Sequence, residues 1–315
     1  MEITIPAQPI GVGTNHSAFP GMVRRPEGVI ELVWRQGTDH FQSRDGRIMR
    51  AVSRNNGTSY AEVTHLRVAA SGTELRDPSI SYARGAHHMT MFTASASAPA
   101  RAGYAIREWG DAVRVDPGLP YAAMCSPVVE LPDGRLGAPF YGRQAGESID
   151  TAWMGWSVDH GKTWTTNRIA NSIGAGVAHN EPWLVVDGTQ THFFYRWGQT
   201  DGIGLRTTPD SGATWGGPRK ILNQASGRPT TLRTGGGVLV MVYRKLPTRA
   251  AAIAYSTDHT ATWQDGGVLM EPPASSPNGM TYAAMAETAP GVVHVVFGME
   301  HSATSSVLYG AGLTV

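Results

Sequence analysis

One eight-residue pattern returns along this chain at a nearly constant spacing, and it limits the possible folds more than any other feature. Its clearest copy is residues 157–164, Ser-Val-Asp-His-Gly-Lys-Thr-Trp. An aspartate can accept backbone N–H bonds across a tight turn, and glycine tolerates the positive φ that such turns need. We therefore expect a turn between two strands, with the tryptophan packed back over the hairpin.

Further copies begin at Thr208 and Ser256, and a degenerate copy begins at Ser53. The aspartates of the three clear copies are 51 and 48 residues apart. A fixed period near 50 residues is typical of an array of one supersecondary unit. We assign a structural role to these aspartates, which are Asp159, Asp210 and Asp258.

A second series of turn signals repeats with a similar period. Each member contains glycine and lies between short runs rich in β-branched and apolar residues, which predict strands. The six predicted hairpin turns are Pro26-Glu27-Gly28, Ala83-Arg84-Gly85, Pro132-Asp133-Gly134, Val186-Asp187-Gly188, Gly235-Gly236-Gly237 and Ala289-Pro290-Gly291. The sequence contains no long helical period.

Two hairpins per repeat and six repeats give an all-β fold of six four-stranded antiparallel units. Six units of about 50 residues account for nearly all of the 315 residues. Blades of this size build β-propellers. We therefore predict a single domain over 1–315, a six-bladed β-propeller. We expect its ring to be closed by the N-terminal strand around Ile3–Ile5, which would complete the last blade.

Composition limits the partners. The net charge of +1 gives no general attraction to nucleic acid, and no apolar run is long enough to span a bilayer. The single Cys125 excludes an intrachain disulfide framework. No spaced His/Cys set and no phosphate loop occur, so we expect no metal among the site residues and no cofactor, and a structural ion in the ring stays open. The first residues lack the pattern of a signal peptide, so we expect no conventional export signal.

Topology places the candidate site. In a four-stranded blade the aspartate turns lie on one rim, and the start of strand one and the end of strand two lie on the other. On that second rim equivalent positions carry arginines, and guanidinium groups bind carboxylate, sulfate or phosphate through paired hydrogen bonds. The predicted ligand-binding residues are Arg35, Arg143, Arg196, Arg228 and Arg244.

Acidic and phenolic residues share this rim. Asp39 follows strand two of the first blade, Glu181 opens the fourth blade and Tyr282 opens the sixth. Two carboxylates near a tyrosine could carry out acid–base chemistry at a sugar ring. Asp77 opens the second blade, and we interpret it as a residue of an Asx-type turn.

With its aspartate-turn repeats, the chain resembles the sialidase superfamily over nearly its whole length. The resemblance implies a six-bladed propeller and a retaining glycosidase with a tyrosine nucleophile. It implies that Tyr282 is that nucleophile, that Glu181 polarises it and that Asp39 is the acid/base. Arg196 and Arg244 would correspond to two of the three arginines that hold sialic acid.

The first-blade arginine of the family motif is missing, because the matching segment is Ser17–Val23. Three alternatives follow from this departure. Another residue, such as Arg35 or Arg143, takes over; or the ligand is not sialic acid; or catalysis has been lost.

Three functions remain open. The first is recognition, and trimming, of cell-surface glycans by a bacteriophage tail protein that partners with other virion proteins and acts outside the cell after lysis. The second is a free exo-acting glycoside hydrolase acting on an anionic sugar. The third is a non-catalytic structural propeller in an assembly. The first and second both predict a glycan partner.

Overall fold

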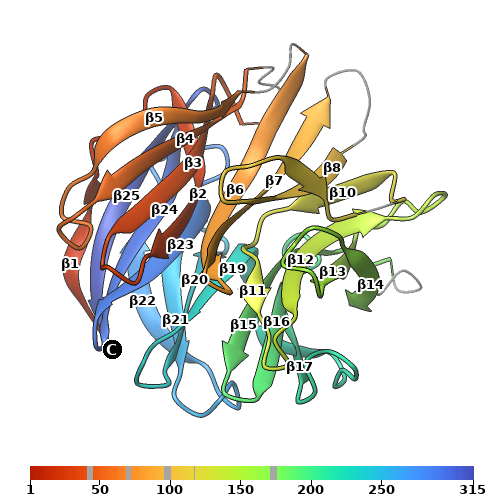
Figure 1. Ribbon diagram of the computed structural model, residues 1–315. Coiled ribbons are helices and arrows are strands. Elements are labelled where there is room, and N and C mark those ends of the chain that lie inside the picture. The colour runs from red at the N-terminus through yellow and green to blue at the C-terminus, as the bar shows by residue number, and fades with distance from the viewer. Residues whose placement is uncertain (41–44, 69–71, 96–100, 117, 171–175) are drawn as a thin grey trace. The chain divides into compact units, whose positions relative to one another are not determined.

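The protein is described from a computed structural model. The residues described are 1–40, 45–68, 72–95, 101–116, 118–170 and 176–315. Across these ranges the chain forms strands and turns without a helix (Figure 1), which confirms the all-β prediction. Accordingly, the described residues contain no helix that could cross a membrane.

The chain divides into two compact units. Unit 1 comprises Met1–Pro78 and Thr230–Val315, and unit 2 comprises Ser79–Pro229. The boundaries fall inside two strands, β6 (Thr73–Ala83) and β19 (Ala225–Arg233). The prediction of a single domain over 1–315 stays a prediction.

Unit 1 holds blade 1 (β2–β5), blade 6 (β23, β24, β25 and β1) and the outer three strands of blade 5. β1 pairs antiparallel with β25, with Ile3 opposite Leu313, so the N-terminal strand completes blade 6 as predicted (Figure 1). The strands are β1 (Glu2–Pro9), β2 (His16–Arg24), β3 (Ile30–Gly37), β4 (Arg47–Ser53), β5 (Ala61–Val68), β20 (Leu239–Lys245), β21 (Ala250–Ser256), β22 (Gln264–Met270), β23 (Met280–Ala289), β24 (Val292–Ser302) and β25 (Ser305–Thr314).

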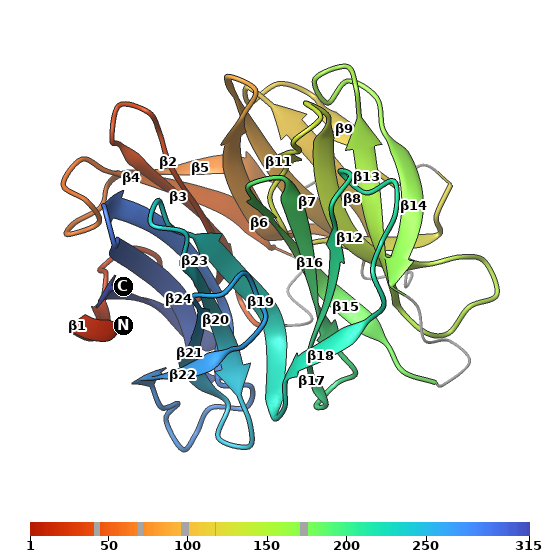
Figure 2. The ribbon, with the colours of Figure 1, turned by 90° about the horizontal axis from the view of Figure 1, so that it is seen from below.

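Unit 2 holds the outer strands of blade 2 (β7, β8 and β9), blade 3 (β10 to β14) and blade 4 (β15 to β18). In blade 3, β12, β13 and β14 run side by side as antiparallel neighbours (Figure 2). The strands of unit 2 are β7 (Ala86–Ser95), β8 (Arg101–Arg107), β9 (Ala112–Arg114), β10 (Tyr121–Met124), β11 (Val129–Glu130), β12 (Leu136–Arg143), β13 (Thr151–Ser157), β14 (Thr165–Ala170), β15 (His179–Asp187), β16 (Gln190–Trp197), β17 (Gly202–Thr208) and β18 (Arg219–Leu222).

The hydrophobic core lies between neighbouring blades. In unit 1, Phe297 and Val240 belong to a cluster that joins blades 5 and 6, and Trp34 belongs to one that joins blades 6 and 1. In unit 2, Phe140 and Phe193 belong to the clusters that join blades 2 and 3 and blades 3 and 4. A blade buries both faces of its sheet against its neighbours, which explains the nearly continuous apolar runs in its inner strands.

The aspartate turns are closed by side-chain hydrogen bonds. Asp159 accepts the N–H groups of Lys162 and Thr163 at 3.1 and 2.9 Å and the Thr163 hydroxyl at 2.6 Å. Asp210 and Asp258 accept the corresponding bonds of their own turns. Hydrogen bonds from threonine hydroxyls lower the pKa of each aspartate to about 2. The largest contribution comes from Thr163 at Asp159, from Thr208 at Asp210 and from Thr262 at Asp258.

The glycine of such a turn also contacts the preceding blade. Gly212 of blade 4 has a φ of 92° and lies against the Trp156 ring of blade 3, where a Cβ would overlap the ring. Gly57 of blade 1 lies in the same way against His294 of blade 6. Positive φ and close approach together require glycine here, so these turns lock one blade to the next.

Candidate functional site

The first strands of three blades carry a non-glycine residue in the left-handed region. Phe19, Asp77 and Glu181 have φ values of 57°, 50° and 49°, and each directly precedes a proline. The strand register shifts at two of these places, between Ala18 and Gly21 and between Asn180 and Trp183. Such backbone costs about 1–3 kcal/mol per residue and is concentrated at functional sites. Bulges of this kind redirect side chains, so these strand ends are candidate site positions.

The interpretation of Asp77 as a turn residue is wrong. Asp77 lies inside β6, is 3% exposed and has Arg76 as a charged neighbour, with Arg76 Nε 3.8 Å from its Oδ1. The positive φ of Asp77 is accommodated within the strand instead of in a turn.

Arg35 lies at the centre of the polar cluster in unit 1. Its side chain is fully buried and donates to Glu74 Oε2 at 3.2 Å and to the Asp39 carbonyl at 2.6 Å. Glu74 also accepts from Arg76 Nη1 at 2.8 Å. Burial lowers the pKa of Arg35, and the positive charge of Arg76 lowers it further. The structure thus holds this predicted ligand-binding arginine against a carboxylate and against the backbone of the predicted acid.

Arg244 supports the strand that carries Tyr282. Its guanidinium donates to the carbonyls of Met280 and Thr281 at 2.6 and 3.3 Å. These are the two residues before Tyr282, whose own side chain is buried. Arg244 therefore fixes the backbone from which the predicted nucleophile projects.

Phe19 occupies the segment in which the family arginine is missing. It is buried, and its ring contacts the Tyr282 and His40 rings edge-on, each with centroids 5.1 Å apart. The Arg76 guanidinium lies 5.3 Å from the Phe19 ring centroid, within reach of a cation–π interaction. A guanidinium therefore lies beside the position of the missing family arginine, but it belongs to Arg76 of β6 rather than to a residue of β2.

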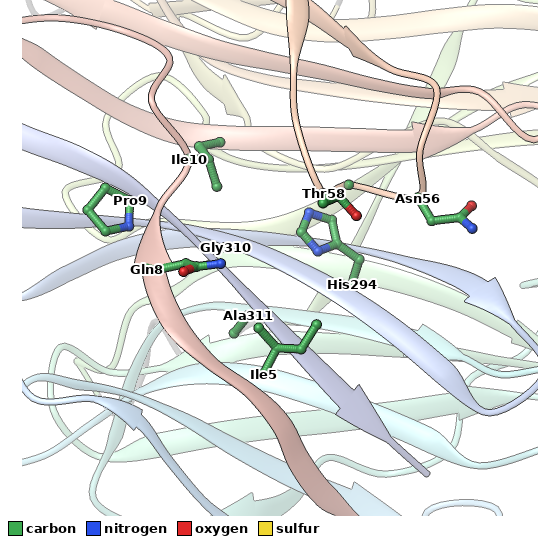
Figure 3. A pocket seen from close by; sticks show the side chains of 10 residues that line it. Ile5, Gln8, Pro9, Ile10, Asn56, Thr58, His294, Gly310 and Ala311 are labelled. Atoms are coloured by element: carbon green, nitrogen blue, oxygen red, sulfur yellow. The ribbon is translucent and has the colours of Figure 1, made fainter.

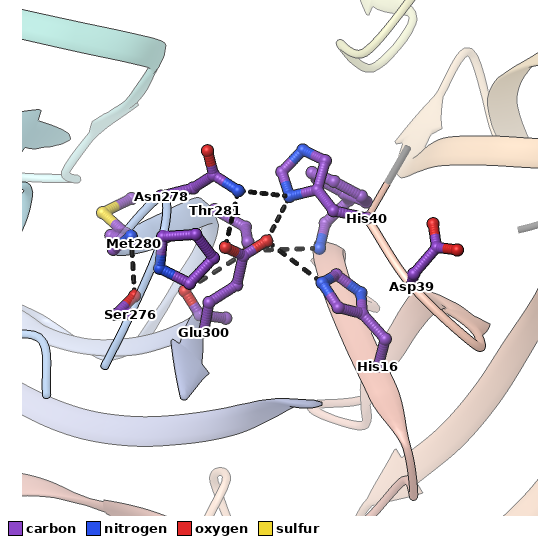
Figure 4. A network of polar contacts seen from close by, with 12 residues as sticks. His16, Asp39, His40, Ser276, Asn278, Met280, Thr281 and Glu300 are labelled. Atoms are coloured by element: carbon purple, nitrogen blue, oxygen red, sulfur yellow. Dashed lines mark hydrogen bonds and ion pairs between the residues drawn. The ribbon is translucent and has the colours of Figure 1, made fainter. Parts of the chain in front are cut away.

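A second polar group lies beside these residues. Glu300 of β24 accepts from His16 of β2, from His40 after β3 and from Asn278 before β23 (Figure 4). The Asp39 side chain turns away from this group (Figure 4). Sequence reasoning missed this group of four residues, because neither their spacing nor their neighbours form a recognisable pattern.

In unit 2, Arg143 and Asp150 form the most exposed charged pair of the candidate site. Arg143 Nε lies 2.9 Å from Asp150 Oδ1, although it is not aligned for a hydrogen bond. Asn180 Nδ2 donates to the other oxygen of Asp150 at 3.0 Å. The side chain of Arg143 is 28% exposed, so a ligand can reach it.

Three guanidinium groups act on Asp150. Burial raises the pKa of its carboxyl, and the charges of Arg143, Arg101 and Arg196 oppose that rise. Arg101 and Arg143 also lie against the Tyr121 ring, 5.1 and 4.0 Å from its centroid. Sequence reasoning missed Arg101, Tyr121 and Asp150. Blade 2, which holds Arg101, has lost its aspartate turn, and neither Tyr121 at the start of β10 nor Asp150 in the loop before β13 belongs to a repeated pattern.

The remaining predicted residues of unit 2 differ in exposure. Arg196 of β16 pairs with Glu181 of β15 at 3.1 Å, and both side chains are about one-tenth exposed. Arg228 is fully buried, donates to the Cys125 carbonyl and lies 4.8 Å from the centroid of the Trp183 ring. Arg196 is thus placed to orient Glu181, whereas Arg228 acts inside the protein.

The structure therefore gathers the predicted residues into two groups. Asp39, Arg35, Arg244 and Tyr282 belong to unit 1. Glu181, Arg143, Arg196 and Arg228 belong to unit 2. That Glu181 reaches Tyr282 stays a prediction.

A pocket of about 110 Å³ lies elsewhere in unit 1, where β1 leaves its regular pairing with β25 (Figure 3). The predicted site residues do not line it. Its wall consists of Ile5, Gln8, Pro9, Ile10, Asn56, Gly57, Thr58, His294, Gly310 and Ala311.

Comparison with known families gives one match. The family described as "BNR repeat-like domain" matches residues 107–295, more than half of the chain. No curated protein matches the sequence.

Solved structures give the fold. A Dyadobacter fermentans protein of unknown function superposes with a TM-score of 0.81 at 16% identity, over 98% of each chain. A Trypanosoma rangeli sialidase gives 0.76 at 12% identity, over 95% of this chain and 55% of its own. A leech intramolecular trans-sialidase gives 0.74 at 12% identity, over 98% and 69%. This chain thus spans little more than half of the trypanosomal enzyme. The likeness confirms the predicted propeller fold and the resemblance to sialidases.

Proposed function

Because this chain belongs to the family of BNR repeat-like domains, we propose that it is a glycan-recognising propeller that binds the acidic group of a sugar. The observation that carries the proposal is the partly exposed Arg143, which lies against Tyr121 and beside Asp150. Arg101 and Arg196 belong to the same charged group. Three guanidinium groups against the carboxylates of Asp150 and Glu181 leave a surplus positive charge for an anionic ligand.

Hydrolysis is the second candidate, favoured by the support given to Tyr282. Arg244 fixes the two carbonyls before it, and Phe19 packs against its ring. In this reaction the Tyr282 hydroxyl attacks the anomeric carbon while Glu181 takes its proton, and Asp39 protonates the leaving oxygen. A phenol avoids the repulsion that a carboxylate nucleophile would meet beside an acidic sugar.

The further proposal that the protein is a component of a bacteriophage tail rests on the sequence alone and extends this function. In that setting the glycan would be a host-surface polysaccharide, and other virion proteins would be neighbours.

Binding and hydrolysis are tested together. Acidic and neutral monosaccharides are titrated calorimetrically into wild type and Arg143→Met, and fluorogenic glycosides are assayed with wild type, Tyr282→Phe and Asp39→Asn. We expect Arg143→Met to weaken binding of the acidic sugar about 10-fold or more, because charged hydrogen bonds are lost. Hydrolysis abolished by Tyr282→Phe and by Asp39→Asn would establish the catalytic assignment.

Arg135→Met is the matched control, because Arg135 precedes β12 and Arg143 ends it. Arg135 also pairs with an aspartate, Asp133, at 2.7 Å and lies 4.7 Å from the centroid of the Trp156 ring. The Arg135→Met variant should bind the acidic sugar as wild type does. Equal binding of acidic and neutral sugars by wild type would contradict the proposal.

A further inference from the structure

Glu300 receives hydrogen bonds from three separate segments of unit 1 (Figure 4). Its side chain is fully buried. His16 Nε2 lies 3.0 Å from Oε1, His40 Nδ1 bonds to the same oxygen, and Asn278 Nδ2 donates to Oε2 at 2.7 Å. Burial alone would raise the pKa of Glu300, but the bonds from His16 and His40 lower it to about 2. The carboxylate is therefore ionised and serves as a common acceptor.

Arg35 decides which nitrogen of His16 carries the proton. Its Nη1 lies 3.4 Å from His16 Nδ1, and since arginine only donates, Nδ1 is the acceptor. The proton of the neutral ring then sits on Nε2, which donates to Glu300. Because the ionised Glu300 carboxylate only accepts, His40 Nδ1 must carry a proton as well, and the 3.5 Å approach of Asn278 Nδ2 to that nitrogen joins two donors.

Two histidines and a carboxylate are also a donor set for divalent transition metals. A ligating histidine normally gives its second N–H to a carboxylate or a carbonyl. The second nitrogen of His16 faces Arg35 instead, and its Nε2 carries the proton that an ion would have to displace. The chemistry of the cluster therefore favours a hydrogen-bonded anchor over a metal centre.

The anchored segment contains the predicted acid. Arg35 Nη1 also donates to the Asp39 carbonyl at 2.6 Å, so one guanidinium nitrogen contacts both His16 and Asp39. The next residue, His40, is held by Glu300 and packs edge-on against Phe19. Residues 39 and 40 are thus fixed on both sides of the peptide bond that joins them.

We propose that Glu300 is a positioning residue that, through His16 and His40, holds the segment after β3 and so sets the place of the Asp39 carboxylate. The inference rests on the proposed hydrolysis for its catalytic consequence but not for its structural one. Glu300 belongs to blade 6 and Asp39 to blade 1, so the device transmits the packing of one blade to the acid on the next.

The kinetic test compares wild type, Glu300→Gln and His40→Phe on the best fluorogenic glycoside. His40→Phe keeps a ring against Phe19 and removes the nitrogen donor. We expect both variants to lower kcat about 10- to 100-fold with KM nearly unchanged, since a small displacement of a catalytic group costs about that much. The alkaline limb of the pH–rate profile, where the acid Asp39 loses its proton, should move as well, which a merely structural substitution would not cause. Wild-type kcat in both variants would overturn the inference.

Asp116→Asn is the control for replacing a buried carboxylate by an amide. Asp116 of unit 2 is fully buried and accepts from Gly103 N–H at 3.0 Å and from Arg114 at 2.8 Å. The Asp116→Asn substitution should lower the free energy of unfolding and leave kcat and the pH–rate profile as in wild type. A loss of kcat in this variant equal to that in Glu300→Gln would overturn the specific role of Glu300.

Amide hydrogen exchange separates this inference from the proposed function. Exchange at residues 38–40 should be about 10-fold faster in Glu300→Gln and His40→Phe than in wild type, whether or not any glycoside is hydrolysed. If wild type hydrolyses nothing but this acceleration appears, the hydrolysis fails and the anchor stands. Unchanged exchange, or stoichiometric binding of Zn²⁺ by wild type that is lost in His40→Phe, would overturn the anchor.

Discussion

Arginines lie at or near the ends of equivalent strands in the two units, but they contact different partners. In unit 1, Arg35 is fully buried and Arg244 donates to two backbone carbonyls. In unit 2, Arg143 and Arg196 keep 28% and 12% of their side chains exposed and face carboxylates. Arg35 and Arg244 therefore donate to backbone carbonyls, whereas Arg143 and Arg196 pair with carboxylates and remain partly exposed. For Arg35 the difference follows from burial, because a buried guanidinium needs its partners inside the protein.

The charge surrounding these arginines differs as well. In unit 1, Arg35 and Arg76 are balanced by Glu74 and Asp77, and Glu300 adds a further negative charge. In unit 2, Arg101, Arg143 and Arg196 outnumber Asp150 and Glu181. Unit 1 is thus suited to placing the predicted acid and nucleophile, and unit 2 is suited to attracting an anion.

The largest expected effect tests the contrast in stability. Arg35→Met should lower the free energy of unfolding by about 3 kcal/mol or more, because it leaves part of a buried charge network uncompensated. Arg143→Met should lower it by less than about 1 kcal/mol, as expected for a partly exposed pair. Urea denaturation monitored by tryptophan fluorescence measures both. Equal losses in the two variants would break the comparison.

A pH effect should be common to both units. Burial lowers the pKa of His40 and His294 in unit 1, and of His88 and His179 in unit 2, to about 4. Between about pH 6.5 and 4 the unfolded chain binds protons that the folded chain does not, so stability falls as the pH falls. The loss should be on the order of 1–2 kcal/mol per histidine at pH 5.

Denaturant midpoints at pH 7 and pH 5 measure this effect. His40→Phe and His179→Phe, one from each unit, should each reduce the pH dependence by a similar amount. A change confined to one of them would show that the two units respond differently to protonation.

The smallest effect sharpens the contrast in charge. Asp150→Asn removes a negative charge beside three guanidinium groups and should strengthen binding of an acidic sugar by a few-fold, with neutral sugars unaffected. The gain should shrink as salt is added. Weaker binding of the acidic sugar would instead make Asp150 part of the ligand contact.

The sequence alone determined the architecture of this protein. Turn chemistry is local, so Asp159, Asp210 and Asp258 could be recognised without the structure, and their period gave the number of blades. The strand pairs and the closing strand followed, because glycine and aspartate at fixed offsets admit few backbone conformations. The rim positions of Arg35, Arg143 and Arg244 also followed from strand order.

Only the tertiary structure decided what these residues touch. The partners of Glu300 come from positions 16, 40 and 278, and Arg76 reaches Phe19 from another blade. Burial separated Arg35 from Arg143, although both lie toward the end of the second strand of a blade. Contacts of this kind depend on how blades pack rather than on neighbours along the chain. For that reason the periodic pattern specified where the arginines lie in their strands, and packing specified which of them stay partly exposed.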